Sequence, residues 1–328
     1  MVQSFPKTPL KNSRTMPTEV VSARTRRWAL ALIWLIPLLW TVNIVAARQA
    51  PGVVSPHVLA LGRWGIAGAV LAAFSWRELR AQHSYVWQHR WRYVALGACG
   101  MWICGALVYL AGESTVGMNI SLIYASSPVL IAVGSVLWLG ERFSKRQTLG
   151  VVLAMTGVVH VVVKGEWAHL SQVQLVAGDL WIVAAAISWA AYALLQKRWP
   201  TTLSPTAQLA CICWGGVAVL LPFAIWELSL ASTPALTPHA WFLMAITALL
   251  PGVGAYWIYG WTQKVLGASR VAMTLYLGPL YTAVVAWLVL GEPLGWHHLA
   301  GGALILSGVG LVMAVQTARR AKIQTEEV

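Results

Sequence analysis

Residues 126–158 have the sequence SSPVLIAVGSVLWLGERFSKRQTLGVVLAMTGV, and the pattern returns at residues 277–309 as LGPLYTAVVAWLVLGEPLGWHHLAGGALILSGV. From Pro128 onward, 11 of the 31 aligned positions are identical without a gap. The shared positions include the proline, a Gly-Glu pair and the spaced glycines of the later segment. Each copy therefore predicts an apolar helix with a proline, a turn and a second apolar helix. We interpret the chain as a duplicated membrane bundle.

The composition supports the same interpretation. Of the 328 residues, 58% are apolar and only 10% are charged, which a soluble domain could not bury without leaving large apolar patches. Segments of about 20 apolar residues match the thickness of a bilayer core, and in lipid such lengths favour helices over barrel strands. The expected fold is an all-α polytopic membrane protein of ten helices. These spans lie near 28–47, 57–76, 93–111, 117–139, 147–163, 178–196, 206–226, 240–260, 268–290 and 298–316.

The ten spans divide into two units of five. We expect a disordered basic tail at 1–27, the first repeat at 28–163, a polar linker at 164–176, the second repeat at 177–316 and a tail at 317–328. The basic residues before the first span also resemble a secretory signal. Against a signal peptide, Trp40 and Asn43 have counterparts in Trp189 and Tyr192, so the first helix is expected to be retained.

The net charge of +13 is explained by topology. With ten spans, 20 of the 23 Lys and Arg residues fall on the side that holds both termini, which the positive-inside rule places in the cytoplasm. The basicity therefore does not indicate a nucleic-acid partner. The four cysteines lie in apolar spans without a Cys-x-x-Cys spacing, so no metal, disulfide or cofactor is expected.

Because each repeat has an odd number of spans, the second repeat enters the membrane from the opposite side. Inverted repeats allow two nearly equivalent packings, which is the basis of alternating access. Pro128 and Pro279 lack an N–H and are expected to kink the fourth and ninth helices at matching points. Paired breaks of this kind indicate a transport site near mid-depth, although a proline can also bend a helix for packing alone.

Several side chains share helical faces at the expected mid-depth. In the third span the 3, 4 and 3 spacing of Trp102, Gly105, Tyr109 and Gly112 places them on one face, and the eighth span repeats this with Tyr256 and Tyr259. Asn119 and Tyr124 lie in the fourth span. Such stripes serve either helix packing or a binding face, and the sequence leaves both open.

Arg63 is a cation within the second span, roughly 9 Å from its outer end. It could extend outward to water, pair with Glu113 at the end of the third span, or contact a substrate. Glu113 is also the one candidate proton site, so proton-coupled and facilitated transport both stay open. His297 and His298 are expected in a solvated turn, and Asp179 at a helix N-terminus.

Together, these residues resemble the EamA domain of the drug/metabolite transporter superfamily, whose ten-helix members contain two such repeats. The resemblance covers about residues 28–316. It is carried by the repeated motifs Pro128 to Gly140-Glu141 and Pro279 to Gly291-Glu292, by the glycines that follow, by Trp40 and Asn43, and by Arg63-Trp64. It implies a central cavity lined by spans 1, 3, 4, 6, 8 and 9. It also implies export of metabolites, often amino acids, across the bacterial inner membrane.

Mapping that cavity onto the faces above gives the expected substrate-binding residues. They are Trp40, Asn43, Trp102, Tyr109, Asn119, Tyr124, Trp189, Tyr192, Tyr256, Tyr259 and Tyr276. Aromatic walls with few polar groups suit an uncharged or zwitterionic, partly apolar solute. We expect a monomeric exporter of small metabolites, with a lipid bilayer and a small solute as its partners. A non-transporting scaffold or receptor, or an intramembrane enzyme, is the alternative; the sequence has no catalytic motif.

Overall fold

The computed structural model describes residues 22–139, 144–169, 176–266, 271 and 277–326, and every regular element among them is helical. The first half contains α1 (Ala23–Leu32), α2 (Leu35–Gln49), α3 (Pro56–Phe74), α4 (Trp76–Ala81), α5 (His83–Gln88), α6 (Arg90–Gly97), the π-helix η1 (Ala98–Ile103), α7 (Cys104–Gly112), α8 (Gly117–Ala125), α9 (Ser127–Leu139) and α10 (Lys145–Val162). The remainder contains the short 3₁₀ helix η2 (Trp167–His169), α11 (Ala177–Arg198), α12 (Pro205–Ser229), α13 (Pro238–Thr247), the π-helix η3 (Ala248–Ala255), α14 (Tyr256–Leu266), α16 (Gly278–Val285), the π-helix η5 (Ala286–Leu290) and α17 (Trp296–Glu326).

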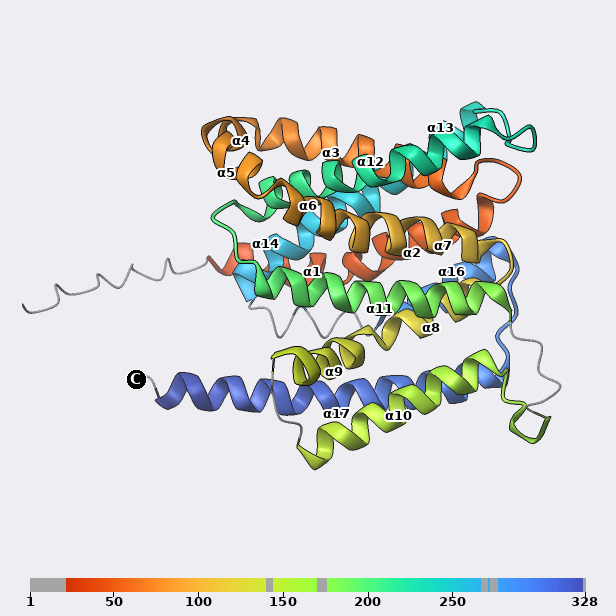
Figure 1. Ribbon diagram of the computed structural model, residues 1–328. Helices are drawn as coiled ribbons and strands as arrows, with labels where there is room; N and C mark the ends of the chain where they lie inside the picture. Colours follow the sequence, from red (N-terminus) through yellow and green to blue (C-terminus); the bar gives the residue numbers. More distant parts are fainter. Residues whose placement is uncertain (1–21, 140–143, 170–175, 267–270, 272–276, 327–328) are drawn as a thin grey trace, which may run out of the picture.

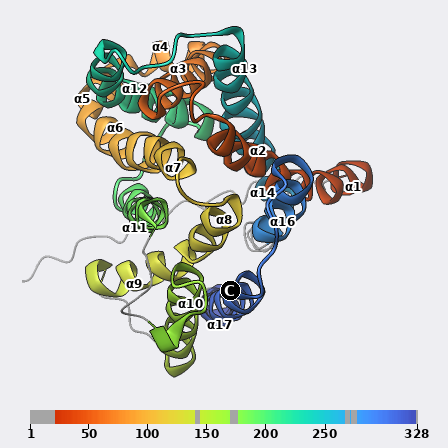
Figure 2. The same cartoon turned by 90° about the vertical axis from the view of Figure 1, so that its right-hand side faces the viewer.

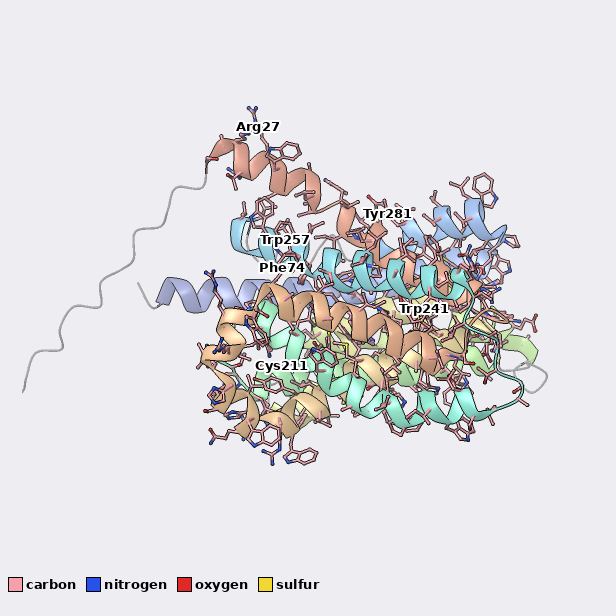
Figure 3. The ribbon with its side chains drawn as sticks, turned by 90° about the horizontal axis from the view of Figure 1, so that it is seen from above. Arg27, Phe74, Cys211, Trp241, Trp257 and Tyr281 are labelled. Atoms are coloured by element: carbon pink, nitrogen blue, oxygen red, sulfur yellow. The ribbon has the colours of Figure 1, made fainter. Side chains whose placement is uncertain are left out.

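Seven helical segments of the described residues, 19 to 27 residues long, are apolar and long enough to cross a bilayer. The expected spans near 147–163, 268–290 and 298–316 are not among these seven, so the count of ten stays a prediction. Their described parts are nevertheless helical, as α10, α16 with η5, and α17. Large apolar side chains cover the outside of the bundle, among them Phe74, Trp241 and Trp257 (Figure 3), and a surface of this kind is compatible with lipid.

The helices run roughly parallel to one axis, and α1 begins at the same end of the bundle at which α17 finishes (Figure 1). α3 and α12 pack against each other in opposite directions. The start of each helix is capped by a glutamate that lies near the C-terminal end of the other helix. Glu227, in the last turn of α12, accepts hydrogen bonds from the backbone N–H groups of His57 (2.9 Å) and Val58 (3.1 Å) at the start of α3. At the other end, Glu78 in α4 accepts from the N–H (2.6 Å) and the hydroxyl (2.5 Å) of Ser204, the N-cap of α12. Both carboxylates thus satisfy N–H groups that a helix start leaves free.

A second antiparallel pair, α10 and α17, lies side by side along the lower face of the bundle (Figure 1). Repeated glycines make their closest contacts. A Cβ on Gly157 would lie 2.8 Å from the carbonyl oxygen of Gly301, and one on Gly308 would lie 2.4 Å from that of Gly150. These four positions are related by the sequence duplication. Small residues let the two backbones approach this closely.

Both prolines lie at the start of a helix. Pro128 is the second residue of α9, which is separated from α8 at Ser126, and Pro279 is the second residue of α16. A proline cannot donate to the carbonyl of Tyr124, and the hydroxyl of Ser127 donates to that oxygen instead, at 2.6 Å. The carbonyl of Tyr124 therefore has a local hydrogen-bond donor despite the proline.

Two π-helical segments fall at matching points of the duplication. η1 interrupts the helix formed by α6 and α7, and η3 interrupts that formed by α13 and α14. A π-turn holds more residues than an α-turn, so it rotates the faces on either side relative to each other. Hydrophobic periodicity does not reveal such a turn.

Candidate functional site

A cavity of about 270 Å³ lies inside the bundle, just below the usual range of about 300–1,000 Å³ for ligand sites. Viewed end-on (Figure 2), α2, α7, α8, α11 and α16 are grouped around the middle of the molecule. Side chains from both halves of the chain line the cavity. The lining residues are Pro37, Trp40, Thr41, Asn43, Ile44, Arg63, Trp64, Gly100, Cys104, Val108, Ile120, Ser121, Tyr124, Ala125, Ser127, Pro128, Trp189, Tyr256, Gly278, Pro279 and Thr282.

One wall of the cavity is aromatic. Trp40 meets Tyr256 edge to face, with ring centroids 6.0 Å apart, and Tyr259 packs on Trp40 at 5.8 Å. Trp189 lines the cavity from α11 and stacks on Tyr192 at 5.0 Å. Trp40 and Trp189 are thus each held by a tyrosine ring that does not itself line the cavity. Such paired rings have a defined orientation.

The structure brings together part of the expected site. Of the eleven residues expected to bind substrate, Trp40, Asn43, Tyr124, Trp189 and Tyr256 line the cavity, together with both prolines and Arg63. Tyr192 and Tyr259 support lining rings, and Tyr109 supports Arg63 and Asn43. Trp102 and Asn119 lie elsewhere, and Tyr276 lies outside the described residues.

The sequence spacing predicts that Trp102 and Tyr109 share one helical face, but in the structure they face different neighbours. Its ring stacks on Phe223 of α12, 4.5 Å away, whereas Gly105 faces Trp64 and Tyr109 faces Arg63. The reason is the π-helix η1, which contains Trp102 and ends before Gly105. The α-helical spacing of 3 and 4 therefore does not apply across it.

Arg63 does not pair with Glu113. Its Nη1 donates to Oδ1 of Asn43 (2.6 Å) and to the hydroxyl of Tyr109 (3.1 Å), and Tyr109 itself donates to the same Asn43 oxygen (2.8 Å). Glu113 follows α7 as an exposed residue and does not line the cavity. Partial desolvation raises the pKa of the Glu113 carboxyl, and the carboxylate of Glu227 raises it further. The expected pairing fails because Arg63 turns toward α2 and α7, into the bundle.

Asn119 belongs to a buried polar network outside the cavity lining. Its amide donates to Oδ1 of Asp179 at 3.0 Å, and the hydroxyl of Thr115 donates to the same carboxylate. The N–H of Gly295 donates to Nδ1 of His298 at 3.0 Å, so in the neutral ring Nε2 carries the proton and donates to Oδ1 of Asn119 at 3.0 Å. His298 is therefore buried, which corrects the expected solvated turn, while Asp179 does lie in the first turn of α11.

An ion pair joins the two halves at the same end of the bundle, where α2 and α7 finish and α8 begins. We call this the Arg48 end. Nε of Arg48 donates to Oε1 of Glu292 at 2.6 Å, and its Nη1 donates to the carbonyl of Gly112. Oε2 of Glu292 accepts from the N–H of Gly117, the first residue of α8, at 2.8 Å. One carboxylate thus ties α2, α8 and the segment after η5 together.

Some cavity-lining positions were missed although the sequence carried a signal for them. Pro37, Thr41 and Ile44 share a helical face with the expected residue Trp40, and all of them line the cavity. Thr282 approaches Thr41 from α16, with the hydroxyl oxygens 3.4 Å apart. By contrast, nothing in the sequence pattern connects His298 with Asn119. Among the described residues no group of three His, Cys, Asp or Glu side chains could hold a metal ion.

The comparison with known proteins agrees with this arrangement of two matching halves around a cavity. The sequence profile of the EamA-like transporter family matches twice, at residues 27–163 and 176–314. The chain belongs to the EamA-like transporter family. It is therefore a multi-pass membrane transporter protein by family, and its partners are a bilayer and a small solute.

Individual relatives extend over most of the chain. The uncharacterized transporter YyaM of Bacillus subtilis is 27% identical over 80% of this chain and 86% of its own length. The uncharacterized transporter YvbV of the same organism is 28% identical over 90% of this chain and 94% of its own. A probable terminal-alkyne amino-acid exporter of Streptantibioticus cattleyicolor is 29% identical over 70% of this chain and 75% of its own.

A solved structure, described only as the crystal structure of a protein, is similar to this EamA-family chain with a TM-score of 0.56. The match covers 90% of this chain and 99% of the chain in the solved structure, at 22% sequence identity. At this level of identity the similarity concerns the fold alone.

Proposed function

We propose that the chain exports small metabolites such as amino acids, in particular aromatic or other partly apolar ones, across the bacterial inner membrane by alternating access. In this proposal the two five-helix repeats are inverted relative to each other and both termini are cytoplasmic. The observation that carries the proposal is the cavity itself, since helices of both halves line it and both Pro128 and Pro279 border it.

The contacts between the halves support the inverted arrangement. Glu227 caps α3 and Glu78 caps α12. The second helix of each proposed repeat is therefore capped by a glutamate near the end of the second helix of the other repeat. The glycine contacts of α10 and α17 repeat the same reciprocity at the last helix of each half. Reciprocal contacts of two similar units in opposite directions are what a two-fold axis in the membrane plane produces.

The cargo is inferred from the lining and from the relatives. Three aromatic rings, Trp40, Trp189 and Tyr256, face a small volume, which suits a solute with an apolar body. One relative carries the name of a probable amino-acid exporter, and export by this chain would be the corresponding activity. Placed with the termini in the cytoplasm, the Arg48 end faces outward.

Counterflow in proteoliposomes tests the proposal. Purified protein is reconstituted with unlabelled L-phenylalanine or L-leucine inside, and entry of the radiolabelled amino acid is followed. We expect entry well above that of protein-free vesicles, and a loss of at least about tenfold for Tyr256→Ala because a lining ring is removed. Trp257→Ala is the matched control, since that neighbouring side chain points away from the core and is exposed. A scaffold or receptor would move neither solute.

A further inference from the structure

The cavity contains a cation that the protein leaves incompletely paired. Arg63 is 5% exposed and lines the cavity beside Trp64, whose ring lies 4.3 Å from the guanidinium carbon. Among the described residues, Nη1 alone makes hydrogen bonds, to Asn43 and Tyr109, and Nε is buried without a described partner. A guanidinium has five N–H donors in a planar fork, so most of its donor capacity is unused.

The charge of Arg63 is likewise uncompensated by the described carboxylates. Glu227 and Glu78 cap helices, Glu292 pairs with Arg48, and Asp179 is held by Asn119 and Thr115. Within the described part of the chain, no carboxylate forms a salt bridge with Arg63 and none lines the cavity. A buried charge without a counter-ion is costly, and an arriving anion would relieve that cost.

The other polar groups of the cavity are largely committed to the backbone. The hydroxyl of Thr41 donates to the carbonyl of Pro37, that of Ser127 to Tyr124, and that of Tyr124 to Cys104. None of them supplies a negative charge. An ammonium group would therefore meet the positive charge of Arg63 without any acidic partner from the described lining, whereas a carboxylate would meet an opposite charge and unused N–H donors.

We propose that Arg63 binds a carboxylate of the transported solute and that this carboxylate, and not an amino group, is the obligatory polar feature of the cargo. The apolar body of the solute then lies against Trp40, Trp189 and Tyr256. The cargo class is an organic monocarboxylate of about amino-acid size, for which the amino group is dispensable. This inference rests on the proposed transport function, of which it specifies the solute.

A ligand series on the unaltered protein tests the inference without any variant. Purified full-length protein in lipid nanodiscs is titrated by calorimetry with L-phenylalanine, 3-phenylpropanoate and 2-phenylethylamine, which share one body and differ in their charged groups. We expect 3-phenylpropanoate to bind at least as tightly as L-phenylalanine, and 2-phenylethylamine to bind about 10- to 100-fold more weakly. The series L-leucine, 4-methylpentanoate and 3-methylbutylamine is expected to give the same order. Equal or tighter binding of the amines, or no binding in either series, would overturn the inference.

Arg63→Gln should remove the preference for the carboxylates, while Arg63→Lys should keep part of it because the charge remains. Arg77→Gln is the matched control, since Arg77 is exposed in α4. If Arg63→Gln does not fold, the ligand series still decides.

The two proposals fail in different ways. Counterflow of the amines as fast as of the carboxylates would refute the role of Arg63 and leave transport intact. Carboxylate binding without counterflow would refute transport alone.

Discussion

At the scale of single residues, Asn119 joins three helices through one amide. Its Oδ1 accepts from His298 of α17 and its Nδ2 donates to Asp179 of α11, while its own backbone belongs to α8. All three side chains are buried. An amide can serve both neighbours because it is donor and acceptor at once, which neither a carboxylate nor an apolar side chain of this size can do.

Replacing Asn119 by leucine, which has a similar shape, should therefore destabilise the protein. Asp179 would keep only its bond from Thr115, and Nε2 of His298 would lose its acceptor, at a cost of about 1–3 kcal/mol for each unsatisfied group. Thermal unfolding in detergent should show a lower midpoint for Asn119→Leu, whereas Gln88→Leu, a change of an exposed amide, should leave it unchanged. If Asn119→Leu unfolds at the unaltered midpoint but loses transport, Asn119 contacts the solute after all.

The sequence could place Asn119 in the fourth span, but it could not predict the partners of its side chain. A helical spacing relates residues of one segment, and His298 lies in a different segment with no spacing to follow. Trp40, Asn43 and Tyr256 were placed on the cavity because the family resemblance implied which spans line it, and repetition and helical periodicity indicated the faces. Arg63 was recognised as exceptional for its charge, and only the packing shows that it turns inward.

At the scale of elements, the pair of α10 and α17 depends on glycines that the duplication repeats. A side chain at Gly157 would meet the carbonyl of Gly301 and the N–H of Ile305, at 2.8 and 2.9 Å from the new Cβ. Backbone atoms of a helix cannot move aside cheaply, so the helices themselves would have to separate. Because these helices are mainly in contact with each other and with α8 and α9, their separation should loosen one side of the bundle.

Gly157→Leu is accordingly expected to lower stability by about 1–3 kcal/mol or more, the usual range for overpacking. Gly310→Leu is the matched control in the same pair of helices, since a Cβ there meets nothing within 4 Å. Unfolding midpoints of the two variants in the same detergent give the comparison. Equal midpoints would mean that Gly157 of α10 does not pack against the backbone of α17.

Elements were predicted from the sequence with uneven success, for physical reasons. An interruption at Pro128 was expected because a proline removes a donor whatever surrounds it, and in the structure α9 begins one residue before Pro128. The π-helices η1 and η3 were not expected, since an extra residue in a turn leaves no mark on composition. Their positions match across the duplication, so a comparison of the two halves is the one sequence signal that could have drawn attention to them.

At the scale of the whole molecule, the links between the halves are concentrated at the Arg48 end. Glu292 ties Arg48 and Gly117 there, and the network of Asn119 connects α8 with α11 and α17 at the same end. A cavity that opens toward this end must break such links, because they join helices that bound it. In the proposed cycle their strength sets the balance between the two orientations, since a conformational equilibrium responds to any interaction present in only one state.

Glu292→Gln should shift that balance toward opening at the Arg48 end, because the charge-assisted bond from Arg48 is weakened while the shape is kept. The readout is a Ser121→Cys probe in the cavity, in a background without the native cysteines, labelled by a membrane-impermeant maleimide from the Arg48 side. Labelling should become several-fold faster with Glu292→Gln. Glu166→Gln should change nothing, since Glu166 is exposed after α10 and forms no salt bridge among the described residues. Unchanged labelling in both variants would mean that the Arg48–Glu292 pair persists in both orientations, and the element that switches would then have to be sought at the proline breaks, where Pro128 and Pro279 border the cavity from opposite halves.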